Sequence, residues 1–99
     1  MSAIRRQKIE RLIEHAKTIE PKLKERIKTE MQKEISENYK YYDEKPDIDE
    51  TELSERLKDA VRQELRNFAL KEFPENNPKT LREYTERAMI QIEPKGNVD

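Results

Sequence analysis

The residues best suited to a specific chemistry are a row of basic side chains on one flank of the N-terminal segment. On a continuous helix they recur three, four and seven residues apart, and no acidic residue of the segment falls on that flank. Such a row can contact successive phosphates of a nucleic-acid backbone. It can equally flank a coiled coil, where alkyl stems cover the interface and the charged ends pair with acids. We favour this second interpretation because the net charge is -1, whereas a nucleic-acid-binding domain is usually basic. The row, here called the basic ridge, consists of Lys8, Arg11, Lys22, Arg26 and Lys33, with His15 among them.

Three tyrosines, Tyr39, Tyr41 and Tyr42, form a second candidate site. Aromatic rings of this kind can stack on the bases of single-stranded nucleic acid. No glycine and no basic residue other than Lys40 is interleaved with them. We therefore expect the tyrosines to close the end of a core or of an interface, with buried rings and hydrated hydroxyl groups.

The residues that most enzyme sites require are missing from this sequence. Gly96 is the only glycine, so the chain has neither a P-loop nor a dinucleotide-binding glycine fingerprint. His15 is the only histidine and there is no cysteine, which rules out a classical zinc site within one chain. No serine has the glycine neighbours of a nucleophile elbow. We expect a protein that is not an enzyme, with no catalytic residues, no metal, no cofactor and no small-molecule substrate.

The acidic stretch 43–49 and the residues after it resemble a calcium loop only superficially. Counting from Asp47, the position that needs glycine is Glu52, and the closing glutamate would be Lys58. We expect a solvated acidic hinge that also caps the following helix.

His15, at the border of the apolar stripe, is a candidate pH switch, but we favour a partly covered helix-surface residue.

Composition indicates one small domain over residues 1–99. Charged residues make up 43% and hydrophobic residues 32%. The N-terminus lacks a secretory signal, and no apolar run approaches the roughly 20 residues of a membrane span. We therefore expect a soluble, intracellular, cytoplasmic protein that does not enter a membrane. The abundance of Lys and Glu is also typical of heat-adapted proteins.

Hydrophobic periodicity predicts an all-α fold with one long N-terminal helix and two shorter ones. Asp49 or Thr51 can cap the second helix, and Asn77 can cap the third. Pro21 interrupts the first segment, which therefore forms either one kinked helix or two helices with Pro21 in the first turn of the second. The predicted elements are helices 3–42, 50–73 and 78–92, the acidic hinge 43–49 and a C-terminal tail 93–99.

An apolar stripe along the first segment predicts how the chain assembles. Nearly everything between the stripe residues is charged, so the helix has one apolar face that must be buried against a partner. We expect this stripe to form the interface of a homodimer. It consists of Ile9, Leu12, Ile13, Ala16, Ile19, Leu23, Ile27, Met31, Ile35 and Tyr39.

Size leaves three ways to bury this stripe. A continuous first helix would be roughly 60 Å long, whereas a compact chain of this length has a radius of gyration of about 13 Å. Either Pro21 folds the helix back, or the helix projects and buries its stripe on another chain, or the three stripes form a small bundle. We favour an intertwined helical dimer, because a small domain with a thin core and no disulfide gains stability from association.

These observations predict a non-enzymatic interaction or structural protein that acts as a homo-oligomer. Accessory proteins of this type are common in phages, viruses and mobile elements. The alternative is a nucleic-acid-binding accessory protein that uses the basic ridge. Residues 1–28 are basic and the hinge is acidic, so the two segments could meet within one chain or between two.

Overall fold

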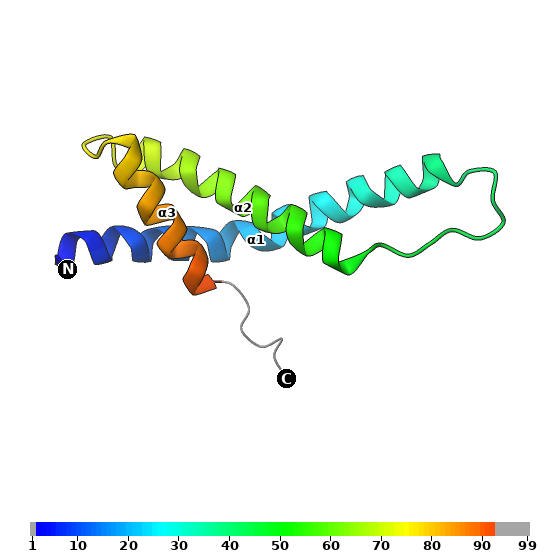
Figure 1. The fold of residues 1–99 in the computed structure, drawn as a ribbon, viewed down its shortest axis with the longest axis horizontal. Coiled ribbons are helices and arrows are strands. Elements are labelled where there is room, and N and C mark those ends of the chain that lie inside the picture. Colours follow the sequence, from blue (N-terminus) through cyan, green and yellow to red (C-terminus); the bar gives the residue numbers. More distant parts are fainter. Residues whose placement is uncertain (1, 93–99) are drawn as a thin grey trace.

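The computed structural model describes residues 2–92, and within them it is all-α, as the periodicity predicts. Its three helices are α1 (Ala3–Asn38), α2 (Glu50–Glu72) and α3 (Pro78–Ile92) (Figure 1). The described residues contain no strand. The predicted tail 93–99 lies outside the described residues.

Helix α1 begins at a serine cap and continues through Pro21 as one helix. The Ser2 hydroxyl accepts a hydrogen bond from the Arg5 backbone N–H at 3.1 Å, which satisfies one of the unpaired donors of the first turn. Pro21 has no N–H to donate to the carbonyl of Lys17, yet the helix extends on both sides of it. Of the two alternatives for this segment, the structure has one helix.

The C-terminal end of α1 differs from the prediction, because the helix ends at Asn38 rather than at residue 42. Tyr39 leaves helical geometry (φ -119°, ψ 25°), although its N–H still donates to the Ile35 carbonyl at 2.9 Å. Aromatic side chains lose rotamer freedom in a helix, and here no packing offsets that loss, since Tyr41 is 89% exposed. The linker between α1 and α2 is consequently longer than the predicted hinge and covers residues 39–49.

The caps of the other two helices follow the sequence. The Asp49 carboxylate accepts hydrogen bonds from two backbone N–H groups of the first turn of α2, including that of Glu52 at 3.2 Å. The Asn77 side chain accepts one from the Thr80 N–H at 2.8 Å, and Pro78 is the first residue of α3. Helix α2 ends one residue earlier than predicted, and α3 has the predicted bounds.

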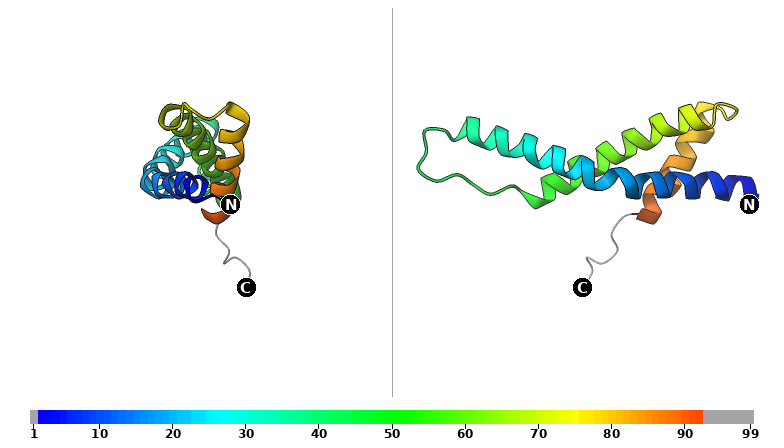
Figure 2. Two further views of the ribbon diagram at one scale, coloured as in Figure 1. Left: turned by 90° about the vertical axis from the view of Figure 1, so that its left-hand side faces the viewer. Right: turned by 180° about the vertical axis from the view of Figure 1, so that it is seen from behind.

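The helices form an elongated molecule with two unlike ends. Helices α1 and α2 cross, and α3 lies across both of them on one side of the crossing (Figures 1 and 2). We call that side the proximal end; the distal end holds the last turns of α1, the linker and the first turns of α2. The molecule measures 58 × 33 × 20 Å and its radius of gyration is 16.9 Å. The chain is therefore more extended than the compact globule, with a radius of gyration of about 13 Å, that its length predicts. The assumption of a compact globule is wrong for this chain.

The hydrophobic core is unevenly distributed between the two ends. The distal cluster has three buried residues, Ile27, Met31 and Leu53. The proximal cluster is larger and includes Leu12 and Leu65, both fully buried. Its buried members are Ile9, Leu12, Ala16, Leu23, Val61, Leu65, Ala69, Phe73, Leu81, Tyr84, Ala88 and Met89.

The single chain already buries most of the stripe that we expect to form a dimer interface. Ile13 and Ile19 pack partly buried against the proximal cluster, Ile35 is partly buried, and Tyr39 is exposed. An interface made of the whole stripe would therefore require two copies to exchange helices, as in an intertwined dimer; this arrangement stays a prediction. The stripe residues buried within the chain are Ile9, Leu12, Ala16, Leu23, Ile27 and Met31.

Candidate partner-binding surfaces

The first residues of the basic ridge lie against acids from the end of α2 and the turn that follows it. The Lys8 ammonium lies 2.7 Å from the Glu75 carboxylate and also donates to the Asn76 side-chain oxygen. The Arg11 guanidinium lies 2.6 Å from the carboxylate of Glu72. The hydrogen bond from Lys8 lowers the pKa of Glu75 below its ordinary value. These two cations therefore have partners within the same chain.

Two phenylalanines, Phe68 on α2 and Phe73 directly after it, pack against the basic residues of α1. The Lys8 ammonium lies 5.4 Å from the Phe73 ring centroid, and the Arg11 guanidinium lies 5.2 Å from it. Both distances fall within cation–π range. The His15 ring stacks on Phe68 with centroids 3.9 Å apart and planes 14° apart. His15 is thus a partly covered surface residue whose ring packs on α2.

The remaining residues of the ridge lie further along α1 and are exposed. Arg26 is 3.9 Å from Glu30, four residues later on the same helix. Lys22 and Lys33 are exposed to solvent. The structure therefore brings Lys8, Arg11 and His15 of α1 together against the C-terminal part of α2 and the turn after it, but leaves the other three residues apart from them.

One arginine forms ion pairs across the two helices of the distal end. Both terminal nitrogens of Arg56 on α2 lie 3.1 Å from the Glu34 carboxylate on α1, and Arg56 also pairs with Glu52. The hydrogen bond from Arg56 lowers the pKa of Glu34, while the same bond raises the pKa of Arg56. Because the folded-state pKa of Glu34 lies below its ordinary value of 4.5, the stabilisation is present above that value and is lost as the pH falls through the folded-state pKa. Both groups are solvent-exposed, so the contribution is small.

The tyrosines do not close the core of the chain, contrary to one of the two expectations for them. Tyr41 is 89% exposed and Tyr42 is 63% exposed. Tyr42 meets Tyr39 edge to face with centroids 5.2 Å apart, and the Lys40 ammonium lies 5.2 Å from the Tyr41 ring centroid. The distal end therefore presents an exposed aromatic surface beside the acids Asp43 and Glu44. The other expectation, that the tyrosines close an interface, stays a prediction.

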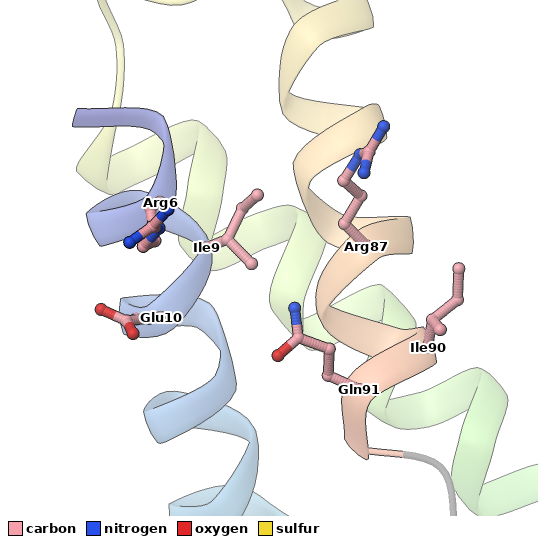
Figure 3. Close-up of a pocket in the computed structure, with 6 residues that line it drawn as sticks. All are labelled: Arg6, Ile9, Glu10, Arg87, Ile90 and Gln91. Atoms are coloured by element: carbon pink, nitrogen blue, oxygen red, sulfur yellow. The ribbon is translucent and has the colours of Figure 1, made fainter. Parts of the chain in front are cut away.

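A groove runs between α1 and α3 at the proximal end (Figure 3). Arg6 and Glu10 extend from α1, Arg87 extends from α3, and Ile9 points from α1 toward α3. Across the same helix pair, Arg5 is joined to Glu83 at 2.7 Å. Nothing in the sequence pattern indicates this groove, because it depends on the angle at which α3 crosses α1. Its lining residues are Arg6, Ile9, Glu10, Arg87, Ile90 and Gln91.

The part of the chain that the structure describes has neither a cluster of metal-ligating side chains nor a helix that could span a membrane. Residues 2–92 contain no group of three or more His, Asp or Glu side chains placed to hold a metal ion. None of the helices in this range is long and apolar enough to cross a membrane.

Comparison with known proteins adds no functional information. No protein-family model matches the chain, and neither does a curated protein or a solved structure.

Proposed function

We propose that the protein is a non-enzymatic helical interaction protein that works as a homodimer. The observation that carries this proposal is the exposed aromatic surface of the distal end, formed by Tyr39, Tyr41 and Tyr42. Tyrosine is enriched in the centres of protein interfaces, because its ring buries a large area at a low cost in side-chain entropy. The distal end, whose cluster has only three buried residues, also gains stability when a partner covers it.

A second copy of the chain is the partner that we favour. Small helical domains with thin cores and no disulfides commonly gain stability by association with themselves. The apolar stripe of α1 also continues past the distal cluster to the partly buried Ile35 and the exposed Tyr39. Covering these two residues would extend the core of each copy.

Nucleic-acid binding through the basic ridge is less well supported. Lys8 and Arg11 pair with Glu75 and Glu72 of the same chain, so phosphate would have to compete with carboxylates already in place. That leaves Lys22, Arg26 and Lys33 as accessible cations of the ridge. Three phosphate contacts would give weak binding that is lost at moderate salt.

The tyrosines provide the test of this proposal. We expect the double variant Tyr41→Ala/Tyr42→Ala to raise the dimer dissociation constant at least about tenfold, because interface tyrosines are commonly worth more than 1 kcal/mol each. Sedimentation velocity over a concentration series measures the constant. Circular dichroism should be unchanged, since both side chains are exposed in the folded chain. Replacing the similarly exposed Leu70 by Ala serves as the control, and an equal effect of both variants would contradict the proposal.

A further inference from the structure

The first two segments of the chain carry opposite charges. Residues 1–28 contain nine cations and four anions, a net charge of +5, and residues 30–55 contain three cations and ten anions, a net charge of -7. Because α1 is a single helix, the basic segment begins at the proximal end while the acidic linker lies at the distal end (Figure 1). The acidic linker and the N-terminal turns of α1 therefore do not contact each other within one chain. They can contact each other only between two chains.

The groove between α1 and α3 offers a docking position at the proximal end. Two arginines line it, Arg6 on α1 and Arg87 on α3, together with one carboxylate, Glu10 (Figure 3). The Arg87 guanidinium also lies 3.7 Å from Glu83, which is joined to Arg5, so the cations here still outnumber the carboxylates. Ile9 lies between the helices, and Ile90 adds an apolar edge that is 67% exposed. A groove of this kind suits an aromatic ring that is followed by carboxylates, because arginine both stacks on aromatic rings and pairs with carboxylates.

The distal linker has a segment of this chemistry. Its residues 41–44 read Tyr-Tyr-Asp-Glu, and all four are exposed. Two rings can supply apolar contact area, and two carboxylates can pair with guanidinium groups. The charge and the apolar character of this segment thus both complement those of the groove.

We propose that residues 41–44 of one copy dock into the groove between α1 and α3 of a second copy, and that two such contacts close an antiparallel dimer. This inference rests on the proposed homodimer and specifies its direction. In an antiparallel pair, the distal end of each copy lies beside the proximal end of the other, so both contacts form at once and the assembly is closed. A parallel pair would instead bring together ends of like charge, which repel each other.

Charge exchange tests the contact. We expect Arg6→Glu/Arg87→Glu alone, and Asp43→Lys/Glu44→Lys alone, each to weaken self-association at least about tenfold, because like charges would face each other in both contacts. A mixture of the two variants should recover affinity to within about threefold of wild type. The mixed dimer pairs the reversed groove with the reversed linker at one contact and keeps the native pairing at the other.

A matched control keeps the charge change but moves it away from the groove. Lys79→Glu/Arg82→Glu alters two exposed residues of the same helix α3. It should leave the dissociation constant within about twofold of wild type. Equal weakening by the control, or no recovery in the mixture, would overturn the proposed contact.

Single labels then test the direction, because the chain has no cysteine of its own. Gln7→Cys and Ser36→Cys place dyes at exposed positions on opposite halves of α1, roughly 44 Å apart within one chain at 1.5 Å per residue. The antiparallel dimer predicts efficient energy transfer between Gln7→Cys of one copy and Ser36→Cys of the other, and inefficient transfer between two Ser36→Cys copies. The reverse pattern would overturn the antiparallel arrangement while leaving the homodimer in place. A monomer under all conditions would overturn the homodimer itself.

Discussion

Leu65→Ala is expected to lower the free energy of unfolding by about 2–5 kcal/mol, the range found for leucine truncation in a close-packed core. Leu65 is fully buried in the proximal cluster, where α2 packs against α1 and α3. Alanine would leave a cavity at this position, and the helices that surround it could collapse only partly to fill it. Urea denaturation monitored by circular dichroism measures the change as a lower midpoint with a similar slope.

Leu70 on the same helix gives the matched control. Its side chain is 53% exposed, so Leu70→Ala removes the same atoms without creating a core cavity. We expect a change of less than about 0.5 kcal/mol, as is usual for surface substitutions. Equal losses for the two variants would mean that α2 does not present this face to the core.

Ile27→Asp is expected to unfold the distal end locally while leaving the proximal end folded. Ile27 is one of only three buried residues in the distal cluster, and a carboxylate there would have no partner of opposite charge in the cluster. An uncompensated buried charge costs about 3 kcal/mol or more, which a cluster of this size cannot offset. Amide hydrogen exchange should show lost protection at 27–38 and 50–56, with the amides of α3 still protected.

Ile4→Asp provides the comparison for this variant. Ile4 lies on the same helix but is 64% exposed, so the same substitution there should leave the exchange pattern unchanged. Loss of protection throughout all three helices of Ile27→Asp would show that the two clusters unfold as one unit.

The helices could be predicted from the sequence because local signals agree with one another. The apolar period, the caps Asp49 and Asn77, and Pro78 at the first position of α3 all act within a few residues of each other. The end of α1 could not be predicted in the same way. It depends on whether any element packs over the tyrosines, and that is a property of the whole fold.

The surfaces were harder to predict for the same physical reason. The basic ridge follows from spacing along one helix, but the partners of Lys8 and Arg11 lie 67 and 61 residues away in the sequence. The groove between α1 and α3 depends on a crossing angle that no local pattern encodes. The separation of charge between the N-terminal part of α1 and the linker could be located only once α1 was seen to be one continuous helix.

The solution mass of the wild-type protein decides whether the chain forms a homodimer. Size exclusion coupled to light scattering, over a concentration series from low micromolar upward at moderate salt, gives this mass without any label. We expect a dimer with twice the chain mass of 12.0 kDa. We also expect the dimer to weaken as salt is raised, because exposed charges are screened. A mass of 12.0 kDa throughout the series would contradict the proposed homodimer.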